Sequence, residues 1–179
     1  MKLDKPIYKV IMALMLVCLA GGIILCVVGV GKDVGNLGGQ ICNLFNIIAL
    51  VFAGFYLLAG YRKDAAKCYQ VFGALFALSQ LLSIAAVSKN GDYWTTLLSA
   101  LALTMILVLF LSKDLGRTKS LTFCGIMLVC FIVLFILLAV QGGGSGAYCR
   151  LSVQVILSLL YGVMTVAKYL DKVERGRAV

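Results

Sequence analysis

The stretch Arg62-Lys63-Asp64-Ala65-Ala66-Lys67 separates two long apolar runs, and a similar stretch, Ser112-Lys113-Asp114-Leu115-Gly116-Arg117, returns fifty positions later. Both read Lys-Asp-x-x-Lys/Arg. Two interpretations are open: a functional motif that is used twice, or the turns of a repeated membrane hairpin. The apolar runs on either side decide the class of fold.

Six apolar runs dominate the chain. Its 179 residues are 63% hydrophobic and 13% charged, with a mean hydropathy of +1.07, whereas soluble domains are about 45–50% apolar and about 25% charged. Each run is long enough to cross a bilayer core of about 30 Å as a helix. We therefore predict an all-α integral membrane protein, a single domain of six transmembrane helices without a soluble domain, with helices at about 7–30, 41–61, 68–87, 93–111, 120–140 and 148–169.

The basic residues predict the orientation of these helices. The N-terminus, the two charged breaks and the C-terminal tail hold 13 of the 16 basic residues, and the other three loops hold one each, at Lys32, Lys89 and Arg150. Because cytoplasmic loops carry the excess of lysine and arginine, both termini are expected in the cytoplasm. We expect a multi-pass protein of the plasma membrane whose direct surroundings are the lipid bilayer.

An aspartate precedes each odd-numbered helix, at Asp4, Asp64 and Asp114. An aspartate at this place caps backbone N–H groups and meets the positive end of the helix dipole. The chain thus reads as three consecutive hairpins, and the charged breaks serve topology and capping first and partner docking second. The residues assigned to this role are Lys63, Asp64, Lys67, Lys113, Asp114 and Arg117.

The repeated Asp-x-x-Lys element is similar at first to that of the mitochondrial carriers, which are also built from three hairpins. In those carriers the motif follows a proline near the C-terminal ends of odd-numbered helices, whereas here it precedes those helices without a proline. No carrier function is therefore transferred to this chain.

Several kinds of chemistry lack the residues that they need. The chain has no histidine, and its seven cysteines form no Cys-x-x-Cys pair, so imidazole catalysis and the usual zinc and redox motifs are excluded. Cys42 and Cys149, at predicted outer helix ends, form either a disulfide or two free thiols, and we favour the thiols. We expect no enzyme, no cofactor and no metal site.

The charges themselves suggest no ligand. The net charge of +9 is spread over short loops without a basic stripe, so we expect no nucleic acid partner. Gly29-Val30-Gly31-Lys32 fails as a phosphate-binding loop because Cys26 and Asp33 occupy positions that need glycine and serine or threonine. No acidic or basic residue lies deep in a predicted helix, which argues against a proton-coupled pump.

Uncharged polar residues gather in the predicted outer halves of the helices. Gln154, Ser158, Tyr161 and Thr165 follow a helical spacing that places them on one face of the sixth helix. Two interpretations are open: a polar cavity for a small solute, or hydrogen bonds that hold helices together, and we favour the second. The candidate substrate-binding residues are Asn43, Asn46, Gln80, Ser83, Ser99, Gln154, Ser158 and Tyr161.

Two functions remain open. The first is a transport or substrate-binding membrane subunit for a small solute. In size and helix number the chain is similar to the substrate-binding subunits of energy-coupling-factor importers, which implies that active import needs a membrane or cytoplasmic partner subunit. The second is a non-catalytic structural or regulatory membrane subunit that acts through helix packing.

Overall fold

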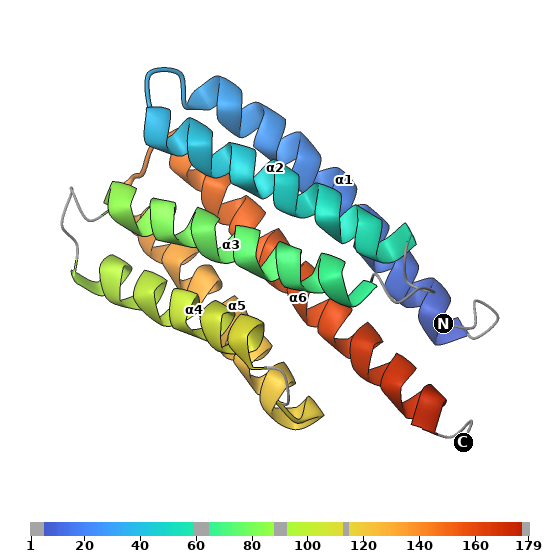
Figure 1. Ribbon diagram of the computed structural model, residues 1–179. Helices are drawn as coiled ribbons and strands as arrows, with labels where there is room; N and C mark the ends of the chain where they lie inside the picture. The colour runs from blue at the N-terminus through green and yellow to red at the C-terminus, as the bar shows by residue number, and fades with distance from the viewer. Residues whose placement is uncertain (1–5, 59–64, 88–92, 113–114, 177–179) are drawn as a thin grey trace.

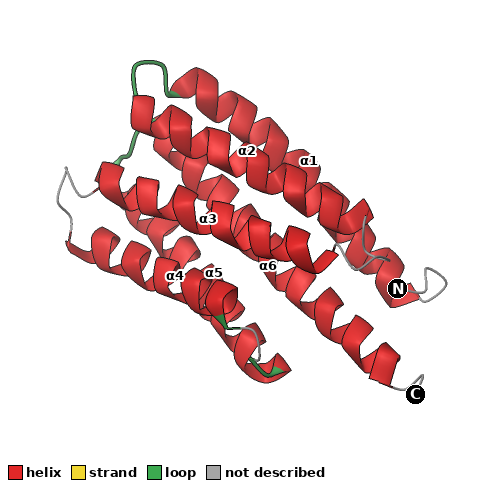
Figure 2. Ribbon diagram, viewed as in Figure 1, coloured by secondary structure: helices red, strands yellow, loops and turns green. Residues whose placement is uncertain are grey.

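The computed structural model describes residues 6–58, 65–87, 93–112 and 115–176, and these residues form six helices (Figures 1 and 2). All six are long and apolar enough to cross a membrane, which confirms the predicted all-helical, multi-pass membrane protein. Their bounds are α1 (Pro6–Lys32), α2 (Leu37–Leu58), α3 (Ala65–Val87), α4 (Tyr93–Leu111), α5 (Arg117–Gln141) and α6 (Ser145–Gly176).

The helices extend further into the loops than the apolar runs suggest. The loop between the first two helices, expected at 31–40 from the predicted helix ranges, comprises only residues 33–36. The Asn36 side chain accepts a hydrogen bond from the Gly39 N–H at 3.2 Å, so α2 starts early. At the end of α5, Gly142 takes the left-handed conformation (φ 71°) that terminates helices, and α6 begins three residues later.

The structure tests the predicted aspartate caps at the start of α5. The N-cap position of α5 is Gly116, which provides no side-chain hydrogen bond, so α5 begins two residues later than capping by Asp114 requires. Lys67 lies in the first turn of α3 and Arg117 begins α5, and both side chains are exposed. Lys63, Asp64, Lys113 and Asp114 lie outside the described residues, as does Asp4.

The six helices follow one another around a closed ring. Each packs against the next in sequence, and α6 closes the ring against α1. α6 also contacts α2 and α3, which makes it the most central helix (Figure 1). The start of α1 and the end of α6 lie at the same end of the bundle. We call the opposite end, where α1 ends and α6 begins, the Asp33 end.

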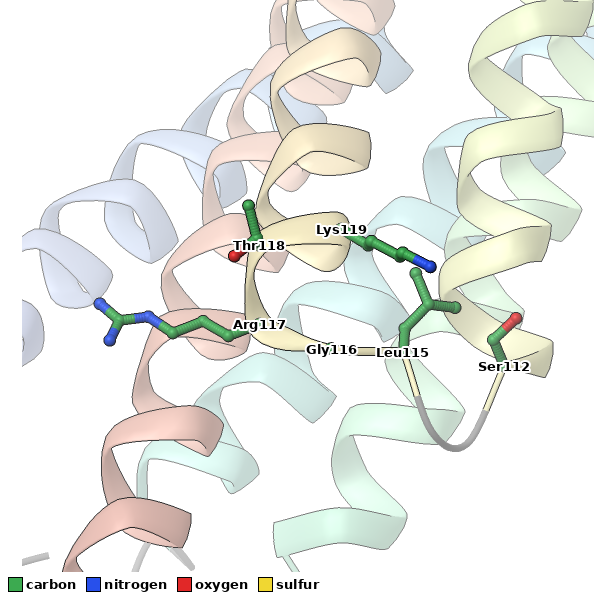
Figure 3. A pocket seen from close by; sticks show the side chains of 6 residues that line it. All are labelled: Ser112, Leu115, Gly116, Arg117, Thr118 and Lys119. Atoms are coloured by element: carbon green, nitrogen blue, oxygen red, sulfur yellow. The ribbon is translucent and has the colours of Figure 1, made fainter.

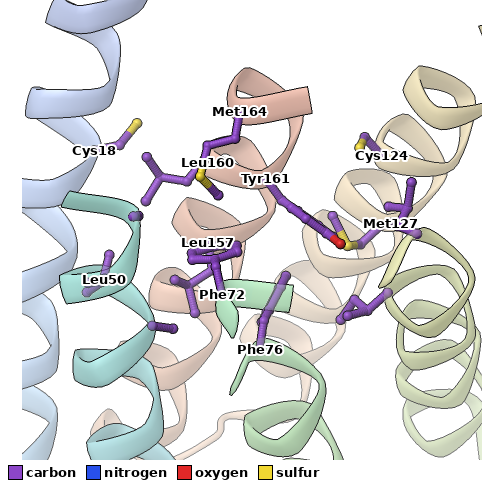
Figure 4. Close-up of a cluster of buried hydrophobic side chains, with 14 of the residues drawn as sticks. Cys18, Leu50, Phe72, Phe76, Cys124, Met127, Leu157, Leu160, Tyr161 and Met164 are labelled. Atoms are coloured by element: carbon purple, nitrogen blue, oxygen red, sulfur yellow. The ribbon is translucent and has the colours of Figure 1, made fainter. Parts of the chain in front are cut away.

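The core lies around α6. Leu157, Leu160, Tyr161 and Met164 of α6 are completely buried, and they pack with α2, α3 and α5 (Figure 4). Large apolar side chains on the outer surface, such as Val17 and Ile24 of α1, are more than 60% exposed. A bundle that is apolar both inside and outside is suited to lipid rather than water as its surroundings.

Candidate functional site

A buried ion pair lies at the Asp33 end of the bundle. Asp33 directly follows α1 and is only 5% exposed, and its Oδ2 accepts hydrogen bonds from Arg150 Nη1 of α6 and from Asn43 Nδ2 of α2, the latter at 3.0 Å. We call Asp33, Asn43 and Arg150 the Asp33 cluster. The cluster connects three helices, because its members come from the end of α1, the start of α2 and the start of α6.

Glycines let the backbones approach this cluster closely. A Cβ atom on Gly39 of α2 would lie 2.8 Å from the Asp33 carboxylate, and one on Gly29 of α1 would lie 3.2 Å from the Asn43 amide. Asp33 also touches Gly146 in the first turn of α6, where the positive end of the helix dipole favours a carboxylate. The buried aspartate is therefore balanced by a guanidinium, an amide and a helix terminus.

A second cluster of polar side chains joins α2 to α3, and its members bond to one another. Ser79 Oγ donates to Asn46 Oδ1 and lies 3.3 Å from Cys42 Sγ, and the three side chains are buried. Nearby on α3, Gln80 Nε2 donates to the Ser99 carbonyl oxygen of α4 at 3.3 Å. These contacts pair polar groups between neighbouring helices, as hydrogen bonds that hold a membrane bundle together do.

Gln154 of α6, in contrast to Ser79 and Asn46, is buried without a hydrogen bond. It lies one helical turn beyond Arg150 on the same face of α6, is completely buried, and neither its Oε1 nor its Nε2 has a hydrogen-bond partner. In the Asp33 cluster the Asn43 Oδ1 is also buried and unpartnered, as is Gln80 Oε1 on α3. Unpartnered buried polar atoms are rare in native structures, so each needs an explanation such as a bound solute or water.

The remaining predicted site residues are Ser83, Ser158 and Tyr161, and the Tyr161 hydroxyl is a further unpartnered buried group. Ser158 donates to the Val155 carbonyl of its own helix at 2.7 Å, and Ser83 is half-buried on α3. Tyr161 of α6 packs against α3, with its ring 4.9 Å from that of Tyr69, and its buried hydroxyl lies beside Gly73 without a hydrogen bond (Figure 4). Seven of the eight residues are buried, but only some lie near the Asp33 cluster.

Sequence reasoning missed the charges of this site. Asp33 and Arg150 were assigned to outer loops, but Arg150 lies in the second turn of α6 and Asp33 is buried beside it. They are 117 positions apart, and no local pattern connects them. Ser79 was also missed, although its position next to Gln80 on a helix interior was a usable signal.

The charged break before α5 borders a pocket of 560 Å³ lined by Ser112, Leu115, Gly116, Arg117, Thr118 and Lys119 (Figure 3). Arg117 extends away from Ser112 and Leu115, and Arg117, Thr118 and Lys119 are exposed. Tyr169 of α6 donates to the Leu115 carbonyl and fixes this segment against the bundle. The pocket is an open hollow on the surface, and none of the described residues that line it is a buried polar residue that could select a ligand.

The cysteines and acidic residues of the described segments form no disulfide and no metal site. Cys42 and Cys149 are free thiols in the structure. Within residues 6–58, 65–87, 93–112 and 115–176, no group of three or more cysteine, aspartate or glutamate side chains is arranged to hold a metal ion. Comparison with known protein families, with curated proteins and with solved structures gives no match for this chain.

Proposed function

We propose that this multi-pass membrane protein binds a small polar solute between its helices, as a transport or substrate-binding subunit. The observation that carries the proposal is Gln154, a completely buried amide on the central helix α6 with both polar atoms unpartnered. The site comprises Gln154 and the neighbouring Asp33 cluster.

The comparison with the closed polar group favours a ligand over helix packing at this position. A residue that holds helices together is expected to be paired, as Ser79 and Asn46 are. An unpaired buried donor or acceptor costs about 1–3 kcal/mol, so Gln154 would be a poor packing residue. A solute or a water molecule that bonds to both amide atoms removes this cost.

The proposal places the Asp33 end on the outer side of the plasma membrane. The described basic residues support this orientation, because Lys32 and Arg150 are the two at the Asp33 end, whereas the others belong to the opposite end, among them Lys9, Lys67, Arg117, Lys119 and Lys168. Both termini are then cytoplasmic, and the helices form three consecutive hairpins. The solute enters from outside, past Arg150, whose side chain is 15% exposed.

Transport of such a solute against its gradient needs an energy source, which we expect a partner protein to supply. We propose a membrane or cytoplasmic partner subunit, docked on the charged breaks near Lys67 and Arg117, and no enzymatic activity of the chain itself. The second candidate function, a structural or regulatory subunit, is favoured by the closed contacts of Cys42, Asn46 and Ser79, which need no ligand.

Cysteine labelling tests whether Gln154 faces a site that polar molecules reach. The purified Q154C variant is treated with methanethiosulfonate ethylammonium, and adducts are counted by intact mass against the wild-type protein with its seven cysteines. We expect one additional adduct in Q154C. The matched control L157C replaces a completely buried apolar residue of the same helix and should gain none. Equal labelling of the two variants, or no labelling of Q154C, contradicts the proposal.

A further inference from the structure

We propose that the solute is a small zwitterion of the amino-acid class, with its carboxylate on Arg150 and its ammonium group toward Asn43 and Gln154. This inference rests on the proposed function and specifies the ligand of the same site. Three features of the site carry it: the spare donors of Arg150, the unpartnered acceptors next to it, and the charge balance of the Asp33 cluster.

Arg150 provides donors that the protein does not use. A guanidinium has five N–H donors in a planar fork that matches a carboxylate through two parallel hydrogen bonds. Among the described residues, Arg150 forms a single hydrogen bond, from Nη1 to Asp33 Oδ2, and this oxygen is shared with Asn43. Asp33 therefore holds the guanidinium in place without occupying the fork. The Arg150 side chain as a whole is 15% exposed, and we propose that the carboxylate reaches the fork from this exposed side.

Two buried acceptors without a donor lie near Arg150. Asn43 Oδ1 belongs to the same cluster and is buried without a donor. Gln154 Oε1 lies one helical turn deeper on the same face of α6. A solute that accepts hydrogen bonds at the rim and donates them to Asn43 Oδ1 and Gln154 Oε1 satisfies the fork and both acceptors. An α-amino acid carries these two groups on neighbouring atoms. The unpartnered donor Gln154 Nε2 then needs an acceptor on the solute or a bridging water molecule.

The charge balance favours a ligand that is neutral overall. Asp33 and Arg150 compensate one another, so the buried cluster is neutral when empty. A carboxylate without a cation would add an uncompensated charge to a site shielded from water, which is costly. A cation without a carboxylate would do the same and would face the guanidinium. A zwitterion brings both charges and leaves the total unchanged.

Four probes of similar skeleton test the ligand class on the purified full-length protein. L-alanine carries both charges, propionate lacks the ammonium group, ethylamine lacks the carboxylate, and propionamide is neutral. Binding is measured by calorimetry and by thermal unfolding, with glycine and L-serine as further zwitterions. We expect at least one amino acid to bind about tenfold or more tightly than the three incomplete analogues, as expected for losing a charge-assisted hydrogen bond.

Variants connect this selectivity to named residues. R150Q should weaken amino-acid binding by about tenfold or more, because the carboxylate loses its charged partner. R117Q, an exposed arginine at the opposite end, is the matched control and should bind normally. Because R150Q leaves Asp33 buried without its cation, D33N/R150Q is a second variant that removes both charges, should fold, and should also lose the amino acid.

Two results overturn the inference. Binding of propionamide as tightly as L-alanine, sensitive to Q154L and insensitive to R150Q, would mean a neutral polar ligand, and the proposed solute-binding function would stand. Failure of all three amino acids to bind would reject the zwitterion class. The labelling of Q154C then decides independently whether the site itself exists.

Discussion

Asp33 is almost completely buried although its neighbours Lys32 and Val34 are exposed. A carboxylate in this position is tolerated because Arg150, Asn43 and the start of α6 surround it. Removing one charge of such a pair leaves the other uncompensated, whereas removing both leaves a neutral site.

A double-mutant cycle should show this coupling in the free energy of unfolding. R150Q should destabilise the protein by about 3 kcal/mol, the low end for a buried pair, since Arg150 keeps some contact with solvent. D33N/R150Q should recover most of this loss. The measurement is denaturant unfolding in detergent micelles, and additive effects of the two substitutions would show that the pair contributes nothing.

The unpartnered amide of Gln154 should lower the stability of the ligand-free protein. Replacing it by leucine removes two unpartnered polar atoms from the core, so Q154L should raise the stability of the ligand-free protein by about 1–3 kcal/mol. Q70L, on an exposed position of α3, is the matched control and should change stability little. The melting temperatures of both variants provide the comparison, and a lower value for Q154L alone would mean that its amide is already satisfied.

Residue types in a helical pattern indicate burial better than they indicate partners. The spacing of Gln154, Ser158 and Tyr161 on α6 predicted one shared face, and all three are buried. The same pattern contains no sign that Gln154 is unpaired while Asn46 is paired, because pairing depends on Ser79 of another helix. The proposed role of these residues in solute binding stays a prediction.

At the scale of elements, the six helices were predicted correctly because each apolar run has the length of a membrane crossing. Their ends were not, since α2 and α6 begin four and three residues before the expected positions. The added turns of α6 carry Gly146, and those of α2 carry Gly39, and both glycines pack on Asp33. Helix ends that contribute to a tertiary site cannot be found from hydrophobicity alone.

The start of α2 should be sensitive to side-chain volume. Gly39→Ala places a methyl group within 2.8 Å of Asp33 and should lower the melting temperature by pushing the cluster apart. Gly54→Ala, further along the same helix, meets no atom within 4 Å and should leave stability unchanged or raise it, because alanine favours helix by about 1 kcal/mol. Equal effects of the two substitutions would show that the close approach at Gly39 is unimportant.

For the whole molecule, the distribution of charge predicts the orientation in the membrane. A C-terminal fusion to green fluorescent protein should fluoresce, and the same fusion to alkaline phosphatase should be inactive, because both termini are expected in the cytoplasm. A phosphatase inserted after Gly35, in the loop at the Asp33 end, should be active instead. The reverse pattern of activities would invert the orientation and place the solute site on the cytoplasmic side.

The sequence predicted the membrane class and the number of crossings, but not the order of packing. Composition indicates that helices lie in lipid, and it says little about which helices touch, because the inner and outer faces are both apolar. The closure of the ring by α1 and α6 depends on contacts between the two ends of the chain.

That closure has a consequence for biosynthesis. Asp33 is made 117 residues before Arg150, and at about 5–20 residues per second the ribosome needs roughly 6–23 seconds to bridge this gap. During this interval the hairpin of α1 and α2 has a carboxylate whose cation does not yet exist. A chain truncated before α6 lacks Arg150, so Asp33 at the end of α1 stays without its cation until α6 has been made. Membrane proteases that remove unfinished proteins would therefore find an unpaired Asp33 in every incomplete chain.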